Sequence, residues 1–192
     1  MKTKTIHIVC SMILCGFSCC IAGEEGFYAS KSADDLCLGV VGIDRLTHPD
    51  QPGSHIARSS EMLIFGARTV TNKDTIVAWP KEPEYLCAAE LLDEGGNGVP
   101  RTKMGRSYGS KYAEFDPSKG RLVRQHINPS SEPCWNLFRP GDLFKISKPG
   151  TYTLRLQLQV LKVQSDRTTN AVEIVRFPIL SLPIRGEDGG NR

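Results

Sequence analysis

The feature that most constrains the fold is a long alternating stretch at residues 151–164, TYTLRLQLQVLKVQ. From Tyr152 to Val160 every second side chain is apolar, and the residues between them are polar. This period of two is typical of a β-strand with one face on a core and the other face in water. A helix would place Arg155 and Gln159 within its apolar stripe. The stretch therefore predicts antiparallel β structure.

The segments on either side of this stretch predict its neighbours. Residues 142–147 predict a short strand, and residues 171–184 predict one strand that returns along the long one. The apolar side chains of both long strands change face partway along, in the first strand at Val160. Because proline lacks a backbone N–H, Pro178 and Pro183 place the returning strand at a sheet edge or at a bulge.

Apolar runs earlier in the chain predict further strands at residues 36–46, 61–71, 74–79 and 122–127. In the first of these the apolar face shifts after Val40, which is how a β-bulge appears in a sequence. Only Asn72 and Lys73 separate the second run from the third, so these two runs predict a hairpin.

Residues 84–93 are ambiguous between helix and strand. Their Ala, Leu and Glu content, after Pro83, suits a helix. The glycine-rich turn at 94–100 is followed at once by another extended run, and this favours a strand–turn–strand unit. We expect the strand–turn–strand arrangement and keep the helix as the alternative.

Two short motifs resemble parts of secreted bacterial immunoglobulin-like modules. LDEGGNGVP at 92–100 is similar to their Asp-x-x-Gly-x-x-Val-Pro hairpin, and PGTYTL at 149–154 resembles the Pro-Gly-x-Tyr-x-Leu start of their penultimate strand. The resemblance implies an immunoglobulin-like sandwich in which Tyr152 anchors a corner, and it implies no active site. Such modules have about 100 residues, so the surplus of this chain is expected at 101–140.

Residues 1–22 have the pattern of a secretory signal peptide, with a short basic start, an apolar run over 8–21 and small residues before a cut after Ala22. The run is shorter than the ~20 residues that a spanning helix needs. We therefore expect a secreted, periplasmic or envelope protein that keeps no membrane span after cleavage. Acylation of Cys19 or Cys20, as in a lipoprotein, is the alternative.

We predict one all-β domain at residues 36–185: an antiparallel immunoglobulin-like β-sandwich of seven to nine strands with a loop-rich insertion. Residues 23–35 are small and polar and predict a flexible N-terminus, and 186–192 predict a disordered tail. The sequence predicts no oligomeric state.

Charge and cysteine usage exclude several classes of function. The chain has 24 basic and 21 acidic residues, and this near balance argues against a nucleic-acid partner. Outside the signal peptide only Cys37, Cys87 and Cys134 remain, and an exported compartment permits one disulfide among them. The spacing does not choose the pair. No Cys-x-x-Cys or His-x-x-x-His pair is present, so we predict neither metal nor cofactor.

The segment 101–124 is the best candidate for a binding surface, because aromatic residues are interleaved with basic ones along it. This composition can bind polyanions or stack on sugars. The candidate binding residues are Arg101, Lys103, Arg106, Tyr108, Lys111 and Tyr112. The alternative is a solvated loop whose aromatic rings pack underneath it.

We expect a non-catalytic exported module that binds a protein or a glycan, or that has a structural role in the cell envelope. No signature around a cysteine points to a nucleophile. The alternative is a small secreted hydrolase with its site in the 101–140 insertion, where His126 would meet Glu114 or Asp116. A third hypothesis is a subunit whose edge at Pro178 adds to a partner's sheet.

Overall fold

The computed structural model describes residues 29–33, 35–43, 56–70, 75–117, 121–127, 134–166 and 169–187. The predicted signal peptide at 1–22 therefore lies outside the described residues. The same holds for the first part of the predicted flexible N-terminus, residues 23–28, and for residues 188–192 of the predicted tail.

Strands make up most of the described chain, as the all-β prediction requires. Eleven strands are described, more than the seven to nine predicted: β1 Ala29–Ala33, β2 Leu36–Gly42, β3 Ala57–Arg58, β4 Leu63–Thr69, β5 Thr75–Pro80, β6 Cys87–Leu92, β7 Leu122–Ile127, β8 Cys134–Asn136, β9 Gly150–Asp166, β10 Thr169–Arg176 and β11 Leu180–Gly186. Short helical segments lie between them: α3 Pro83–Leu86, α4 Lys103–Ser107, η2 Tyr112–Glu114 and α5 Pro140–Leu143.

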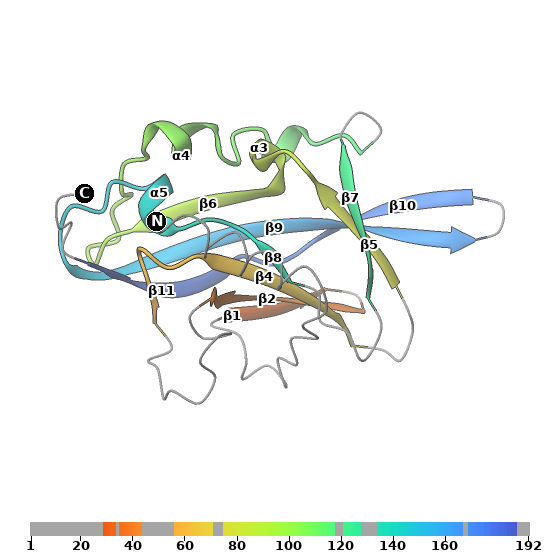
Figure 1. Cartoon of the computed structure of the whole chain (residues 1–192), viewed down its shortest axis with the longest axis horizontal. Helices are drawn as coiled ribbons and strands as arrows, with labels where there is room; N and C mark the ends of the chain where they lie inside the picture. The colour runs from red at the N-terminus through yellow and green to blue at the C-terminus, as the bar shows by residue number, and fades with distance from the viewer. Residues whose placement is uncertain are drawn as a thin grey trace, which may run out of the picture.

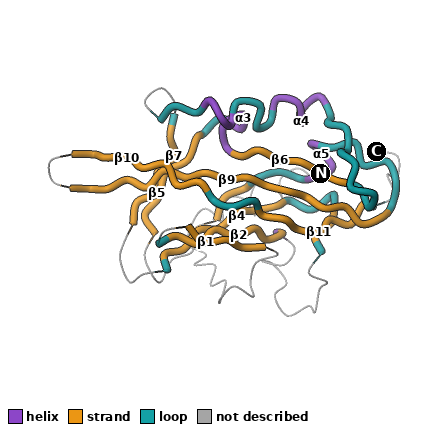
Figure 2. The backbone as a smooth tube through the Cα atoms, turned by 180° about the vertical axis from the view of Figure 1, so that it is seen from behind, coloured by secondary structure: helices purple, strands orange, loops and turns teal. Residues whose placement is uncertain are grey.

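Strand β9 is the centre of the larger sheet, whose order is β3-β11-β9-β5-β7. Along one side β9 pairs first with β11 and then with β10, and along the other side it pairs with β6 and then with β5. All these pairs are antiparallel, and among the described strands β3 and β11 alone pair in parallel. In Figures 1 and 2 the β9–β10 hairpin projects beyond the rest of the chain. The strand predicted at 151–164 is thus confirmed.

The smaller sheet has the order β1-β2-β4-β8 and shares one core with the larger sheet. Apolar side chains of both sheets belong to this core, among them Phe65 of β4 and Trp79 of β5. The two rings meet edge to face, with their centroids 6.2 Å apart. From β9 the core takes Leu154, Leu156 and Leu158, which are at most 1% exposed. The alternation in the sequence therefore places the buried face of β9 correctly.

The predicted change of face in β9 is confirmed. Up to Val160 the apolar side chains join the main core, whereas Leu161 and Val163 join a second cluster with Ala78 and Phe115. The returning strand 171–184, however, is two strands, so that prediction needs a correction.

The two returning strands are separated by an irregular step at Pro178. Arg176 of β10 lies opposite Gln159, but Leu180 of β11 lies opposite Leu156, so one extra residue stands between the two registers. That is the signature of a β-bulge, and Pro178 lies within it. The prediction of an edge or a bulge is thus met by the bulge, while β11 has a partner on its other side at Ile184 and Arg185, where β3 pairs with it.

Two other strand predictions are wrong because sequence-local patterns did not reveal the sheet arrangement. The runs at 61–71 and 74–79 do not form a hairpin, since β4 and β5 belong to different sheets. The face shift in 36–46 is not a bulge, because β2 keeps one continuous register with both β1 and β4. Every residue of β2 is buried, and a strand buried on both faces needs no alternation.

Three segments differ from their predicted local structure. Residues 142–147 are not a strand, since Pro140 starts the single turn of α5 and only Phe144 makes an isolated bridge, to Arg101. The ambiguous segment 84–93 contains both alternatives: one helical turn, α3, and then β6. Residues 29–33, within the predicted flexible N-terminus, pair along β2 as β1.

Candidate functional site

A row of short helical segments covers the sheet beside β6 (Figure 2). Helix α4 begins after Thr102, whose Oγ1 accepts a hydrogen bond from Gly105 N at 3.0 Å and donates one to the carbonyl oxygen of Asp142 at 2.5 Å. A side chain at Gly105 would place its Cβ 1.9 Å from the carbonyl oxygen of Leu143. Glycine at this position therefore allows α4 to lie directly against α5.

Arg101 links α4 and the residue after it to strand β6 of the larger sheet. Its Nη1 donates to the carbonyl oxygens of Gly105 at 2.8 Å and Tyr108 at 3.0 Å, and its Nη2 donates to that of Ala89 on β6. The guanidinium also lies 5.8 Å from the centre of the Phe144 ring. These contacts give Arg101 a structural role, because backbone carbonyls already take its donors.

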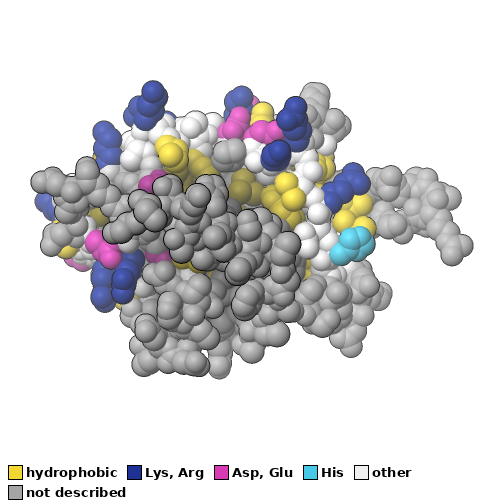
Figure 3. Space-filling model, viewed as in Figure 1, with side chains coloured by type: hydrophobic (Ala, Val, Ile, Leu, Met, Phe, Trp, Pro, Cys, Tyr) yellow, Lys and Arg dark blue, Asp and Glu magenta, His cyan; other side chains and the backbone are white. Residues whose placement is uncertain are grey.

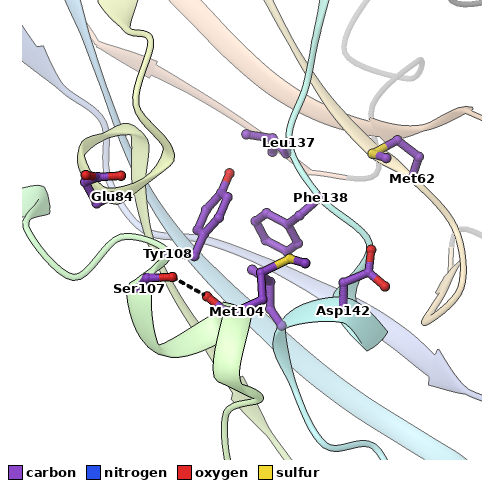
Figure 4. Close-up of a pocket in the computed structure, with 9 residues that line it drawn as sticks. Met62, Glu84, Met104, Ser107, Tyr108, Leu137, Phe138 and Asp142 are labelled. Atoms are coloured by element: carbon purple, nitrogen blue, oxygen red, sulfur yellow. Dashed lines mark hydrogen bonds between the residues drawn. The ribbon is translucent and has the colours of Figure 1, made fainter.

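An apolar groove of about 290 Å³ opens between α4, α5 and the chain that follows β8 (Figure 4). Most of its lining is apolar, and the Tyr108 and Phe138 rings meet edge to face with centroids 5.0 Å apart. Met104 of α4 remains 60% exposed. The lining residues are Met62, Glu84, Met104, Ser107, Tyr108, Leu137, Phe138, Asp142 and Leu143.

Two carboxylates and two hydroxyls, those of Ser107 and Tyr108, are the polar side-chain groups of the described lining. Figure 4 shows Glu84 and Asp142 on opposite sides, with the Tyr108 and Phe138 rings between them. Neither carboxylate forms an ion pair with another residue in the described part of the chain. The hydroxyl of Ser107 donates to the carbonyl oxygen of Met104 at 2.9 Å, so its proton is already engaged.

Buried titratable groups lie beneath this cover. Burial raises the pKa of the Cys87 thiol to about 12 and that of the Tyr112 hydroxyl to about 12. Burial, and then the neighbouring Cys87, also raise the pKa of Tyr108. The tyrosine hydroxyls at 108 and 112 have no hydrogen-bond partner of normal geometry among the described residues. All three groups are therefore neutral near pH 7, and a neutral thiol is a poor nucleophile.

The residues predicted as a binding set are divided by the structure. Lys103, Arg106 and Lys111 are exposed, and basic side chains lie along this edge over α4 and α3 in Figure 3. Tyr108 and Tyr112 are 7% and 8% exposed, so their rings cannot stack on a ligand in this conformation. The groove lies beside this basic edge, and of the predicted set only Tyr108 lines it.

The other predicted chemistry is not brought together in the described residues. His126 is exposed on β7, and neither it, Glu114 nor Asp116 lines the groove. Within the described ranges no group of three His, Cys, Asp or Glu side chains could hold a metal ion. Cys37 and Cys87 are buried free thiols in the structure, and every pair among the three cysteines would include one of them, so no disulfide is formed by these two described cysteines. The side chain of Cys134 lies outside the described part, and the disulfide stays a prediction.

No family model matches this chain, and no curated protein is similar enough to it to count as a relative. In the described part of the chain no helix combines the length and the apolar character that crossing a membrane would need. The site must therefore be interpreted from its own chemistry.

Proposed function

We propose that this chain is an exported, non-catalytic binding module of immunoglobulin-like architecture that holds a segment of another protein in the groove. The observation that carries the proposal is the open apolar lining, in which Met104 stays 60% exposed. Apolar surface left in water costs about 25 cal/mol per Å², and a concave apolar site with a few polar groups is the usual form of a ligand site.

The architectural part of the proposal is supported by the corner at the start of β9. The hydroxyl of Tyr152 donates to the carbonyl oxygen of Lys148 at 2.9 Å, as a tyrosine that anchors a corner does in immunoglobulin-like domains. The two sheets around one core agree with a sandwich. The number of strands is larger than in the usual module, and the extra elements include the helical cover that forms the groove.

A protein ligand is favoured over a glycan by the position of the aromatic rings. Sugars stack on exposed flat faces, whereas Tyr108 and Tyr112 are buried. The methionines at the groove are flexible and polarisable, and such side chains adapt to apolar side chains of different shape. A non-catalytic role is favoured because the Ser107 hydroxyl is engaged and no histidine is among the described lining residues. Ser107 lies in a Gly-x-Ser-x-Gly sequence at 105–109, but it ends helix α4, whereas a nucleophile of that motif stands at a strand-to-helix turn.

The proposal is tested with a neutral apolar dye, N-phenyl-1-naphthylamine, titrated into the purified protein. We expect saturable fluorescence enhancement in the wild type and at least tenfold weaker binding in Met104→Glu. The matched control is Val70→Glu, which places the same charge at an exposed apolar residue that does not line the groove. Equal loss in both variants, or no saturable binding in the wild type, would overturn the proposal.

A further inference from the structure

We infer that the groove selects a basic amphipathic segment: an apolar anchor with a Lys or Arg side chain on each side of it. This inference rests on the proposed function and specifies the partner's chemistry. It comes from the position of the charges relative to the apolar floor.

The groove is acidic at both ends. Glu84 comes from α3 and Asp142 from α5, and Figure 4 shows them on opposite sides of the apolar floor. Among the described residues that line the groove none is basic. An apolar group seated between the two carboxylates would therefore be placed best if cationic groups flanked it on both sides.

The basic residues nearby do not neutralise these carboxylates. The lining residues of α4 are Met104 and Ser107, which share one face of the helix by their spacing, and Tyr108 follows directly after its end. Lys103 and Arg106 lie on α4 as well, but they are exposed and do not line the groove. The exposed side of α4 is thus basic, whereas the groove is acidic. A basic segment is therefore attracted to the groove and repelled by the surface beside it.

The groove lining is expected to distinguish partner segments by their charge more than by the shape of their apolar side chains. Met62 and Met104 reach the groove from different parts of the chain, and methionine adapts to side chains of different shape. An acidic or carboxylate-bearing ligand would meet Glu84 and Asp142 and be repelled. Discrimination between partners is then achieved by repulsion as much as by attraction.

Three labelled peptides of equal length test the inference by fluorescence anisotropy with the full exported chain. Each carries a central leucine pair. The residues on both sides of the pair are lysine in the first peptide, glutamine in the second and glutamate in the third. We expect the lysine peptide to bind most tightly, the glutamate peptide to bind least, and the lysine advantage to fall as salt is raised from about 50 to 500 mM.

Variants then assign the selectivity to the two carboxylates. We expect Glu84→Gln and Asp142→Asn each to lower the affinity for the lysine peptide by roughly two- to five-fold, the range of a surface ion pair. Either substitution should weaken binding of the lysine peptide more than binding of the glutamine peptide, because only the lysine peptide carries the charges that the carboxylates attract. Glu114→Gln is the control, because Glu114 is an exposed carboxylate that does not line the groove.

The outcomes separate the inference from the function on which it rests. Equal binding of the lysine and glutamine peptides, with dye binding intact, would overturn the inference and leave the groove as a binding site. Tighter binding of lauric acid than of any peptide would also overturn it, because that ligand carries the wrong charge. Failure of both dye and peptides would overturn the proposed function as well.

Discussion

The hydroxyl of Tyr152 donates a hydrogen bond to the carbonyl oxygen of Lys148, four residues earlier, over 2.9 Å. The same ring closely approaches Gly186 at the end of β11, where a Cβ would lie 2.6 Å from Tyr152 Cε2. Close by, Glu94 Oε1 accepts a hydrogen bond from Thr151 N at 3.0 Å. The two motifs that resemble immunoglobulin-like modules, at 92–100 and 149–154, are thus joined at one end of the sheet.

Removing this hydroxyl should destabilise the fold. For Tyr152→Phe we expect the free energy of unfolding to fall by about 1 kcal/mol, the net value of a typical hydrogen bond. Urea denaturation measures the change. Tyr112→Phe is the paired control, because it removes a buried hydroxyl without a partner among the described residues and should be neutral or stabilising. The same loss in both variants would contradict a special role for the corner.

The contact between α4 and α5 should depend on Gly105. In Gly105→Ala the new Cβ would lie 1.9 Å from the carbonyl oxygen of Leu143, so the two helices must move apart. We expect a loss of about 1–3 kcal/mol in the free energy of unfolding, as for other overpacked sites, and weaker binding of the neutral dye. Gly98→Ala is the control, since nothing lies within 4 Å of its Cβ position. A stable Gly105→Ala variant with normal dye binding would show that the contact is unimportant.

Stability should decrease in alkali because of Cys87. Its pKa is raised from 9.0 to about 12 by burial, so the folded chain keeps a proton that the unfolded chain releases. The stability that depends on this group is complete below about pH 9 and is lost as the pH rises toward 12. Urea midpoints at pH 7.5, 9 and 10.5 measure the slope. In Cys87→Ala we expect a shallower alkaline slope, with the remainder due to the buried tyrosines Tyr108 and Tyr112, whose pKa values burial also raises. An unchanged slope would contradict this assignment.

Export can be checked on the protein itself. We predict that intact mass of the exported protein will show a chain that starts at Gly23. Alkylation before and after reduction then counts free thiols and tests the predicted disulfide among Cys37, Cys87 and Cys134. A lipid adduct on Cys19 or Cys20 would support the lipoprotein alternative, and an uncut chain would contradict the export prediction.

The alternation in β9 could be predicted because each side chain's environment follows from its position in one strand. Gln159 departs from the pattern: it lies on the polar face but is only 2% exposed, since η2 covers it and the carbonyl oxygen of Tyr112 accepts its Nε2 hydrogen bond at 3.1 Å. The sequence around Gln159 carries no sign of this cover. The error at Asn72 and Lys73 has a similar origin, since a short connection does not reveal whether its strands share a sheet.

The groove could not be predicted because its walls come from distant segments. Met62, Glu84, Met104, Phe138 and Asp142 become neighbours only after the sheets and their helical cover have assembled. The segment 101–124 supplies Met104, Ser107 and Tyr108 to the groove, but of the predicted binding set only Tyr108 is among them, and that set stays a prediction. The sequence could not show that Tyr108 packs against Phe138, nor that Lys103, Arg106 and Lys111 are absent from the groove lining.

The central position of β9 also has a consequence for the order of events during synthesis. Strands β5 and β6 leave the ribosome long before residues 150–166, yet β9 is the strand to which both of them pair. The larger sheet therefore has no centre until nearly the whole chain has been made, and these pairings span long sequence separations that slow folding. Under the proposed export, most of the chain would therefore be made while the larger sheet still lacks its central strand.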